Sequence, residues 1–292
     1  MLLEIAIGDA YGMGFEFAKK DALKERKNDG ETYAPHPFHD IKPGHYTDDT
    51  QMSLAVAEVL LAQGPLARRE HFAEAFVKAY HRDPRLGYSS GFQALLNETK
   101  TGAELCQKLR PQSIGSGSAM RACPIGFLEK QDDVLRVAET QARITHDTLE
   151  GIAAAQGVAM MIHWSLQHGP DVRFQLRNKI RSLHPLLDEA LWKPWTDPVP
   201  NEGLPALNAA LSVLESADNM QDAAIRSVST AGDVDTVAAI AMGAASLLLP
   251  NEKRHIPENL MNNLENKAYG RSYLEKLDKQ LFQTFLPKPR SL

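Results

Sequence analysis

The chain has 292 residues, of which 43% are hydrophobic and 24% are charged, and its formal net charge is −5. That composition is typical of a globular protein whose core needs no disulfide framework. The negative balance argues against a nucleic-acid partner, because proteins that bind nucleic acid carry a basic face. The two cysteines, Cys106 and Cys123, lack the paired spacing of a zinc site and favour a reducing, cytoplasmic setting.

Neither a targeting segment nor a membrane span is expected. The first residues, Met1-Leu2-Leu3-Glu4, lack the positive n-region and apolar core of a signal peptide. The longest apolar stretch covers 237–249 and falls short of the roughly 18 residues that a membrane span needs. The sequence therefore predicts no membrane partner.

Helical periodicity dominates the chain. Apolar residues recur at steps of three and four after His146 and predict a helix with one apolar face. These residues are Ile152, Ala155, Ala159, Ile162 and Leu166. Asp147 followed by Glu150 predicts a capping box at the start of that helix.

Further helices are predicted from near Thr50 and over 205–217, 222–229, 234–249 and 269–285. The 234–249 helix is apolar on nearly every face, which predicts that it lies inside the protein. No stretch alternates apolar and polar residues with β-branched enrichment, so few or no strands are expected. Because no repeat or linker is evident, one all-α domain over 1–292 is the expectation.

Three glycines fall within seven residues in Gly8-Asp9-Ala10-Tyr11-Gly12-Met13-Gly14, which Phe15 and Glu16 follow. Each glycine costs a helix about 1 kcal/mol relative to alanine. Two interpretations remain open. The glycines suit a helix that packs closely on another element, and they also suit a helix that ends where the backbone must approach a ligand.

Two acidic turns precede predicted apolar helices. The first reads Tyr46-Thr47-Asp48-Asp49-Thr50. Threonine and aspartate are favoured helix N-caps, and the helix dipole stabilises acids there. An N-cap explains one of the two acids. The second acid favours a cation site. Because adjacent side chains diverge, Asp48 and Asp49 can each bind a different metal ion.

The second acidic turn reads Ala231-Gly232-Asp233-Val234-Asp235-Thr236. An EF-hand loop also starts with Asp-x-Asp, but the apolar residues over 237–240 exclude that loop. If the two turns converge, they form an all-oxygen dinuclear site. Oxygen ligands select Mg²⁺ or Mn²⁺ over zinc or copper.

A glycine-rich loop, Gly115-Ser116-Gly117-Ser118-Ala119-Met120-Arg121, lies in the turn-rich stretch 110–118 and its continuation. Small residues with free backbone N–H groups can cradle a phosphate, although a plain flexible loop has the same composition. His146 lies just before its predicted helix. It is open to interpretation as a cap, a packed surface residue or a catalyst.

The order of these motifs resembles that of the ADP-ribosylglycohydrolase family. Gly-Asp-Ala-x-Gly-x-x-x-Glu is followed by Thr-Asp-Asp-Thr, then by Gly-x-Gly-x-Ala-Met-Arg-x-x-Pro-x-Gly, then by Thr-His and Gly-Asp-x-Asp-Thr. The matches run from Gly8 to Gly243. The resemblance implies an all-α, orthogonal helical bundle with a cleft that holds two Mg²⁺ or Mn²⁺ ions.

The resemblance also implies roles for matching residues. The implied metal ligands are Thr47, Asp48, Asp49, Asp233, Asp235 and Thr236. The implied contacts to the diphosphate of ADP-ribose and its surroundings are Ser113, Gly115, Ser116, Gly117, Ser118, Met120 and His146. Glycosidic cleavage needs a carboxylate that moves protons, and the candidates are Glu16, Asp49 and Asp233.

The implied reaction is hydrolysis of the glycosidic bond between ADP-ribose and a modified substrate. ADP-ribosyl-arginine on a protein is the first expectation, with ADP-ribose as product. The alternatives are a dinuclear hydrolase of another ADP-ribose or nucleotide derivative, a catalytically idle ADP-ribose-binding relative, and a helical adaptor without a ligand. The sequence departs from the commonest family pattern at Ser116, Ala231 and Val234, where Asn, Gly and a small or polar residue are usual.

Overall fold

The computed structural model describes residues 1–19 and 26–286. Within these ranges the chain forms helices and no strands, and two isolated bridges join Gln112 to His146 and Val199 to Gly232. The predicted all-α class is confirmed. The first α-helices are α1 (Leu2–Gly12), α3 (Asp48–Gln63), α4 (Arg69–Arg82), α5 (Ser90–Glu98), α6 (Gly102–Lys108), α7 (Gly117–Met120) and α8 (Gln131–Ala142).

The second half of the chain adds α9 (Leu149–His168), α10 (Leu176–Arg181), α11 (Pro185–Ala190), α12 (Gly203–Ser216), α13 (Met220–Ser227), α14 (Val234–Leu248), α15 (Glu258–Asn263) and α16 (Arg271–Phe285). Short 3₁₀ helices cover Gly64–Leu66, Cys123–Phe127, Gly169–Gln175 and Asn251–Lys253.

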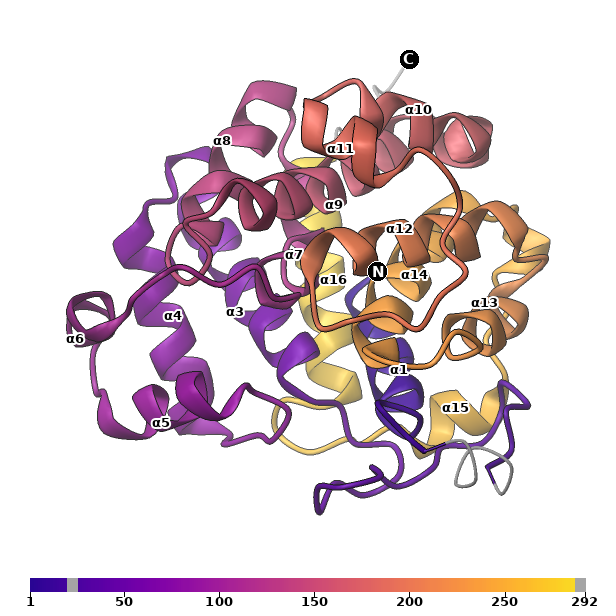
Figure 1. The fold of residues 1–292 in the computed structure, drawn as a ribbon. Coiled ribbons are helices and arrows are strands. Elements are labelled where there is room, and N and C mark those ends of the chain that lie inside the picture. The colour runs from indigo at the N-terminus through magenta and orange to yellow at the C-terminus, as the bar shows by residue number, and fades with distance from the viewer. Residues whose placement is uncertain (20–25, 287–292) are drawn as a thin grey trace.

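Helices α1 and α14 lie against each other in the middle of the bundle (Figure 1). A Cβ atom on Gly8 would lie 2.2 Å from the carbonyl oxygen of Ala238, and one on Gly12 would lie 2.5 Å from the Cα atom of Asp235. The glycines at these two positions therefore serve close helix packing. This contact fixes the beginning of α14, where the second acidic turn lies, against the end of α1.

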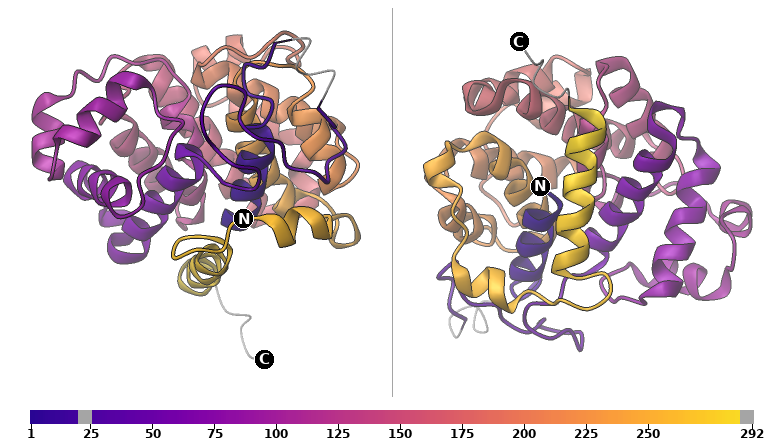
Figure 2. Two further views of the ribbon diagram at one scale, coloured as in Figure 1. Left: turned by 90° about the horizontal axis from the view of Figure 1, so that it is seen from below. Right: turned by 180° about the vertical axis from the view of Figure 1, so that it is seen from behind.

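Helix α14 is buried at every position except Ser246, which confirms the predicted interior helix. It also contacts α9, α12 and α13. From behind, α16 crosses the bundle beside α1 and α3 (Figure 2). The acidic turn at the start of α14 thus stands on the most buried element of the fold.

Several helices start a few residues from their predicted positions because other residues cap them. Helix α3 begins at Asp48 rather than near Thr50, since Thr47 is its N-cap. The predicted capping box of Asp147 and Glu150 is wrong. Thr148 is the N-cap of α9, and its hydroxyl accepts a hydrogen bond from the Gly151 amide at 3.1 Å.

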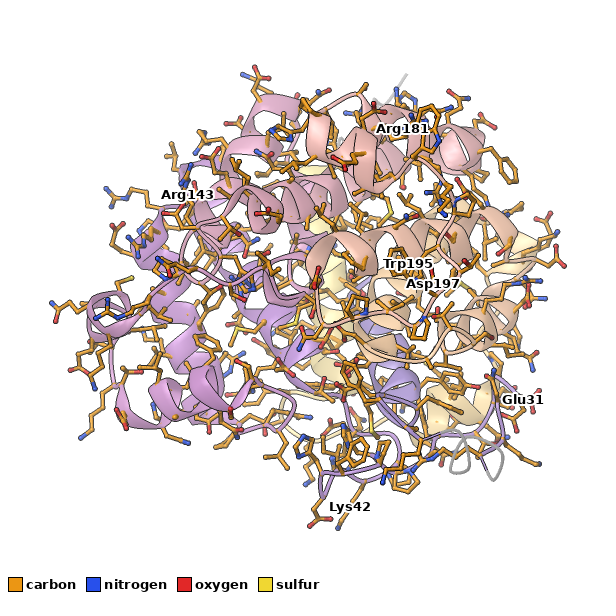
Figure 3. All side chains as sticks on the ribbon, viewed as in Figure 1. Glu31, Lys42, Arg143, Arg181, Trp195 and Asp197 are labelled. Carbon is orange, nitrogen blue, oxygen red and sulfur yellow. The ribbon has the colours of Figure 1, made fainter. Side chains whose placement is uncertain are left out.

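The outer surface carries long charged side chains, among them Lys42, Arg143 and Arg181, which project away from the ribbon (Figure 3). Asp147 forms an ion pair with Arg143 there. Among residues 1–19 and 26–286, no helix combines the length and apolar character needed to cross a bilayer.

Candidate active site

A cleft of about 620 Å³ opens where α3, α7 and α14 begin. It is lined by predicted site residues from all the sequence motifs: Glu16, Asp48, Asp49, Ser113, Gly115, Ser116, Gly117, Met120, His146, Asp233, Asp235 and Thr236. Two predicted residues, Thr47 and Ser118, are not among the lining residues. Segments separated by more than a hundred residues in sequence therefore meet at one cavity.

The first acidic turn is held by Asp9, which projects from α1. The Asp9 carboxylate accepts hydrogen bonds from the Thr47 amide at 3.0 Å and from its hydroxyl at 2.8 Å. It also accepts bonds from the Thr50 amide at 3.0 Å and from the Thr50 hydroxyl at 2.6 Å. Asp9 is fully buried and so anchors the turn that presents Asp48 and Asp49. Sequence reasoning missed this role. The available signal was an acid in the middle of a helix that is apolar apart from Glu4 in its first turn.

The second acidic turn has a left-handed backbone at Ala231 (φ +62°) and Gly232 (φ +93°). It is tied to a neighbouring loop, because the Val199 amide donates to the Ala231 carbonyl and the Asp233 amide donates to the Val199 carbonyl, both at 2.9 Å. The Phe17 amide donates to the Gly232 carbonyl at 2.9 Å. Because the backbone at position 231 is left-handed, glycine would suit this position better than the alanine that this chain has.

Replacing Ala231 with glycine is expected to stabilise the protein by about 1 kcal/mol, because a non-glycine residue in the left-handed region costs roughly 1–2 kcal/mol and glycine loses part of that gain in chain entropy. Thermal unfolding should show a rise of about 2 °C. Gly232→Ala is the matched comparison with the opposite expected effect. It should destabilise the protein, because its Cβ would lie 2.0 Å from the Val199 carbonyl oxygen. A lower melting temperature for Ala231→Gly would contradict the strain at this position.

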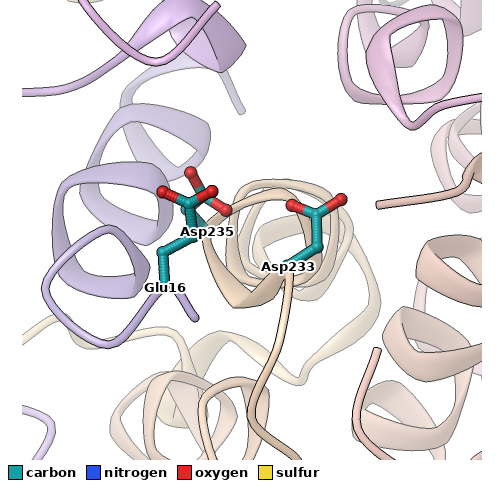
Figure 4. A group of neighbouring side chains, drawn as sticks. All are labelled: Glu16, Asp233 and Asp235. Carbon is teal, nitrogen blue, oxygen red and sulfur yellow. The ribbon is translucent and has the colours of Figure 1, made fainter. Parts of the chain in front are cut away.

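Three carboxylates crowd together at the mouth of the cleft. Oxygen atoms of Glu16, Asp233 and Asp235 lie within 4.8 Å of one another (Figure 4). Across the described residues, Asp49 Oδ1 and Asp233 Oδ2 are buried without a hydrogen-bond partner. A buried unpaired acceptor costs about 1–3 kcal/mol, and coordination of divalent cations would satisfy such acceptors. The all-oxygen donor set fits Mg²⁺ or Mn²⁺.

Burial raises the pKa of these aspartates. It raises the pKa of Asp233 to about 6 and lifts that of Asp235 well above its usual range, with repulsion from Glu16 adding to the effect. Burial and the negative charge of Asp9 raise the pKa values of Asp48 and Asp49 in the same way. The cleft therefore disfavours a full set of ionised carboxylates unless a cation offsets their charge.

The raised pKa values predict how pH changes the stability of the metal-free protein. Unfolded aspartates titrate near pH 4, so the folded protein holds these protons more tightly. Its free energy of unfolding should fall by the order of 2–3 kcal/mol as pH rises from about 4 through the folded pKa of about 6. Metal binds the deprotonated form, so stabilisation by Mn²⁺ should grow over the same interval. Melting curves with chelator and with Mn²⁺ at pH 5 and pH 7.5 measure both effects. An equal Mn²⁺ shift at the two pH values would contradict this prediction.

The glycine-rich loop is fixed by its own contacts. The Ser113 hydroxyl accepts from the Gly115 amide at 3.0 Å, and the amide and hydroxyl of Ser116 donate to Asn201 Oδ1 at 3.3 and 3.0 Å. The amides of Gly115 and Ser116 are thus already engaged. The Ser118 hydroxyl donates to the Gly151 carbonyl, away from the cleft, so its predicted contact with substrate lacks support from the geometry.

His146 is a buried wall of the cleft, and it neither caps α9 nor lies on the outer surface. Arg121 donates to the Thr145 hydroxyl at 2.8 Å, and that hydroxyl lies 2.6 Å from His146 Nδ1. The Thr145 hydroxyl therefore links the buried guanidinium of Arg121 to the His146 ring. Burial, with the charge of Arg121, lowers the pKa of His146 to about 3 and keeps the ring neutral.

Arg121 is itself buried and has no carboxylate partner among the described residues. It donates to Gln141 Oε1 at 2.6 Å, and its guanidinium lies 4.6 Å from the centre of the Phe76 ring.

A second residue that sequence reasoning missed is Gly87. Its φ is +112°, and a Cβ there would lie 2.1 Å from Asp48 Oδ1, so only glycine allows the loop to close over Asp48.

Comparisons with known proteins match nearly the whole chain to one family. A family model described as ADP-ribosylglycohydrolase matches residues 1–290. ADP-ribosylarginine hydrolase Tri1 of Pseudomonas putida (strain GB-1) is 29% identical over 85% of this chain and 69% of its own length. The ADP-ribosyl-[dinitrogen reductase] glycohydrolase of Rhodospirillum rubrum is 27% identical over 82% of this chain and 81% of its own length.

A solved structure named ADP-ribosylglycohydrolase-related protein complex superposes with a TM-score of 0.76 over 98% of this chain and 96% of that chain, at 23% identity. At that identity the likeness supports the fold alone. The family match covers nearly the whole sequence, and the predicted motif residues meet in one cleft. The chain therefore belongs to the ADP-ribosylglycohydrolase family of hydrolases.

Proposed function

We propose that this chain hydrolyses the glycosidic bond between ADP-ribose and an arginine side chain of a modified protein, and so releases ADP-ribose. The observation that carries the proposal is the cleft in which two acidic turns meet the glycine-rich loop. A relative named ADP-ribosylarginine hydrolase supports arginine as the leaving group, and a relative named for ADP-ribosyl-dinitrogen reductase supports a protein substrate.

The residues around the cleft fit two divalent ions. Asp48 and Asp49 would hold them from α3, and Asp233, Asp235 and Thr236 from the start of α14. When bound, Mg²⁺ or Mn²⁺ would supply positive charge that orients ribose hydroxyls and withdraws electrons from the anomeric carbon. Thr47 has the least capacity of the proposed ligands, because its hydroxyl donates to Asp9 and accepts from the Asp49 amide at 3.4 Å, which leaves one lone pair for a metal.

We assign the diphosphate to the glycine-rich loop, because Gly115, Ser116 and Gly117 line the cleft. A Cβ atom on Gly117 would lie 3.0 Å from His146 Cε1, so glycine there lets the His146 ring pack against the loop. Met120 and the neutral His146 form the adjoining wall. The lowered pKa of His146, about 3, makes its ring a poor base, so we assign it to substrate binding.

Glu16 is the best placed of the three candidate catalytic carboxylates. Its side chain is 18% exposed, whereas Asp49 and Asp233 are buried and keep unpaired oxygens that suit metal ligands. A carboxylate at the mouth of the cleft can take a proton from water or give one to the leaving group. We therefore propose that Glu16 moves the proton and that Asp49 and Asp233 act mainly through metal.

A panel of linkages tests the proposal. The purified protein is incubated in Mn²⁺ with arginine-linked and serine-linked ADP-ribosyl peptides and with an O-acyl ADP-ribose ester, and free ADP-ribose and AMP are quantified. We expect ADP-ribose as product and the fastest release from arginine. Faster release from serine or the ester would overturn the leaving group. Release of AMP or phosphate would instead indicate a nucleotide hydrolase.

A further inference from the structure

Glu16 lies in a turn that is tied down on both sides. On one side, a Cβ on Gly14 would lie 2.9 Å from both the Cβ and the carbonyl oxygen of Ala34. On the other, the Phe17 amide donates to the Gly232 carbonyl at 2.9 Å, and Phe17 has a φ of +44°. The backbone at Glu16 is therefore fixed between the 34–36 segment and the second acidic turn.

The side chain of Glu16 needs an anchor of its own. Its carboxylate lies beside those of Asp233 and Asp235, and like charges at this distance repel one another. A glutamate side chain with three rotatable bonds would turn toward solvent to escape that repulsion. The Nε2 atom of His36, whose side chain is 2% exposed, lies 2.7 Å from Glu16 Oε2 and holds the carboxylate in place.

The backbone fixes which nitrogen of His36 carries the proton. His36 Nδ1 accepts hydrogen bonds from the amides of Phe38 and His39, both at 3.0 Å. Because an amide only donates, Nδ1 carries no proton, and the ring hydrogen lies on Nε2. His36 is thus a donor to Glu16, and this bond engages only Oε2 of the carboxylate. Within residues 1–19 and 26–286 the other oxygen, Oε1, has no hydrogen-bond partner, so it can meet substrate or water.

The loop that carries His36 is joined to the turn that carries Glu16. The guanidinium of Arg26 donates to the carbonyl of Gly14 and, at 2.6 Å, to the carbonyl of Pro35. The His36 amide also donates to the Ile41 carbonyl at 3.2 Å. The distance between the His36 ring and Glu16 is therefore set by main-chain contacts on both sides.

We propose that His36 is the positioning residue for Glu16: its Nε2–H donates to Oε2, keeps the carboxylate beside Asp233 and Asp235, and leaves Oε1 for the proton transfer. This inference rests on the proposed function of Glu16 and adds a residue that no sequence motif contains. Because His36 acts through Glu16, it should affect the rate of the chemical step rather than the binding of ADP-ribose or metal.

Kinetics on an arginine-linked peptide test the inference. We expect His36→Ala to lower kcat about 10- to 100-fold, as loss of an orienting partner commonly does, with KM and Mn²⁺ affinity within about twofold of the wild type. His36→Gln keeps an N–H donor and should recover part of kcat. Lys42→Ala is the matched control, because it removes an exposed side chain from the same loop and keeps the amides that bond to His36.

A double variant separates positioning from general damage. In a Glu16→Ala background, His36→Ala should change kcat by less than about twofold, because coupled residues are not additive. The inference would be overturned if the kcat losses of Glu16→Ala and His36→Ala multiplied independently in the double variant. A rise in KM in place of a fall in kcat for His36→Ala would also overturn it.

Nuclear magnetic resonance of the ring nitrogens gives a readout that needs no activity. The wild type should show His36 protonated at Nε2, and Glu16→Ala should shift that N–H signal. Protonation at Nδ1, or no shift, would overturn the positioning role. If the wild type releases no ADP-ribose from any substrate, the proposed function fails, and the nitrogen spectra still decide the role of His36.

Discussion

Asp235→Ala is expected to abolish metal-dependent release of ADP-ribose and to remove the thermal shift caused by Mn²⁺. Asp235 lies in the first turn of α14, is 4% exposed and shares a cluster with Glu16 and Asp233. Stabilisation by metal is worth several kcal/mol in hydrolases of this kind, and each 1.36 kcal/mol is a factor of ten. We therefore expect a loss of at least about 10³-fold in kcat/KM.

The same substitution should leave the metal-free protein as stable as the wild type or more stable. Burial and repulsion by Glu16 raise the pKa of Asp235, so its ionised form is unfavourable in the fold. A variant with normal melting in chelator and no response to Mn²⁺ would separate metal binding from folding. Asp188→Ala, which removes an exposed acid from α11, is the control. A full Mn²⁺ shift in Asp235→Ala would contradict its place in the metal site.

Asp9→Ala is expected to cost about 3–5 kcal/mol of unfolding free energy, the range for breaking a buried charged network. Four buried donors on Thr47 and Thr50 lose their acceptor, and each unpaired group costs about 1–3 kcal/mol. Relief of repulsion with Asp48 and Asp49 offsets part of this cost. Because the turn that presents both acids loses its anchor, Mn²⁺ affinity should also fall about 10- to 100-fold.

Denaturant unfolding and Mn²⁺ titration measure these two effects of Asp9→Ala. Asp9→Asn should rescue them only in part, because its Oδ1 still accepts hydrogen bonds while its NH₂ group faces donors in place of the second oxygen. Thr50→Ser keeps both the amide and the hydroxyl that bond to Asp9, so it should behave like the wild type. A loss of less than 1 kcal/mol in Asp9→Ala would show that other contacts hold the first acidic turn.

Apolar periodicity predicted α3, α9, α12, α13, α14 and α16, with their first residues less well placed. It named no helix at α4, α5, α6, α8, α10, α11 or α15. The interior character of α14 follows directly from its composition, because a helix without a polar face has nowhere else to lie. The start of α9 differed from its prediction because two neighbouring residues, Asp147 and Thr148, are both competent caps, and only the three-dimensional contact with Gly151 decides between them.

Local motifs predicted the acids of the cleft, while the contacts that orient them depend on tertiary structure. Asp9 acts as a cap for a helix that starts 39 residues later, and no local pattern reports that packing. His36 lies in a turn-rich segment without a motif, and its role depends on a glutamate 20 residues away. The direction of the Ser118 side chain, toward Gly151, is likewise set by packing against α9.

The rate of ADP-ribose release from an arginine-linked peptide, measured in Mn²⁺, in Mg²⁺ and in chelator on one preparation, tests the central claim most directly. We expect release with either ion and almost none in chelator, restored when metal is returned, because the acids of the cleft fit divalent ions. Release in chelator at the same rate would contradict a metal-dependent reaction at these acids. The absence of release under every condition would contradict the proposed hydrolysis of ADP-ribosyl-arginine.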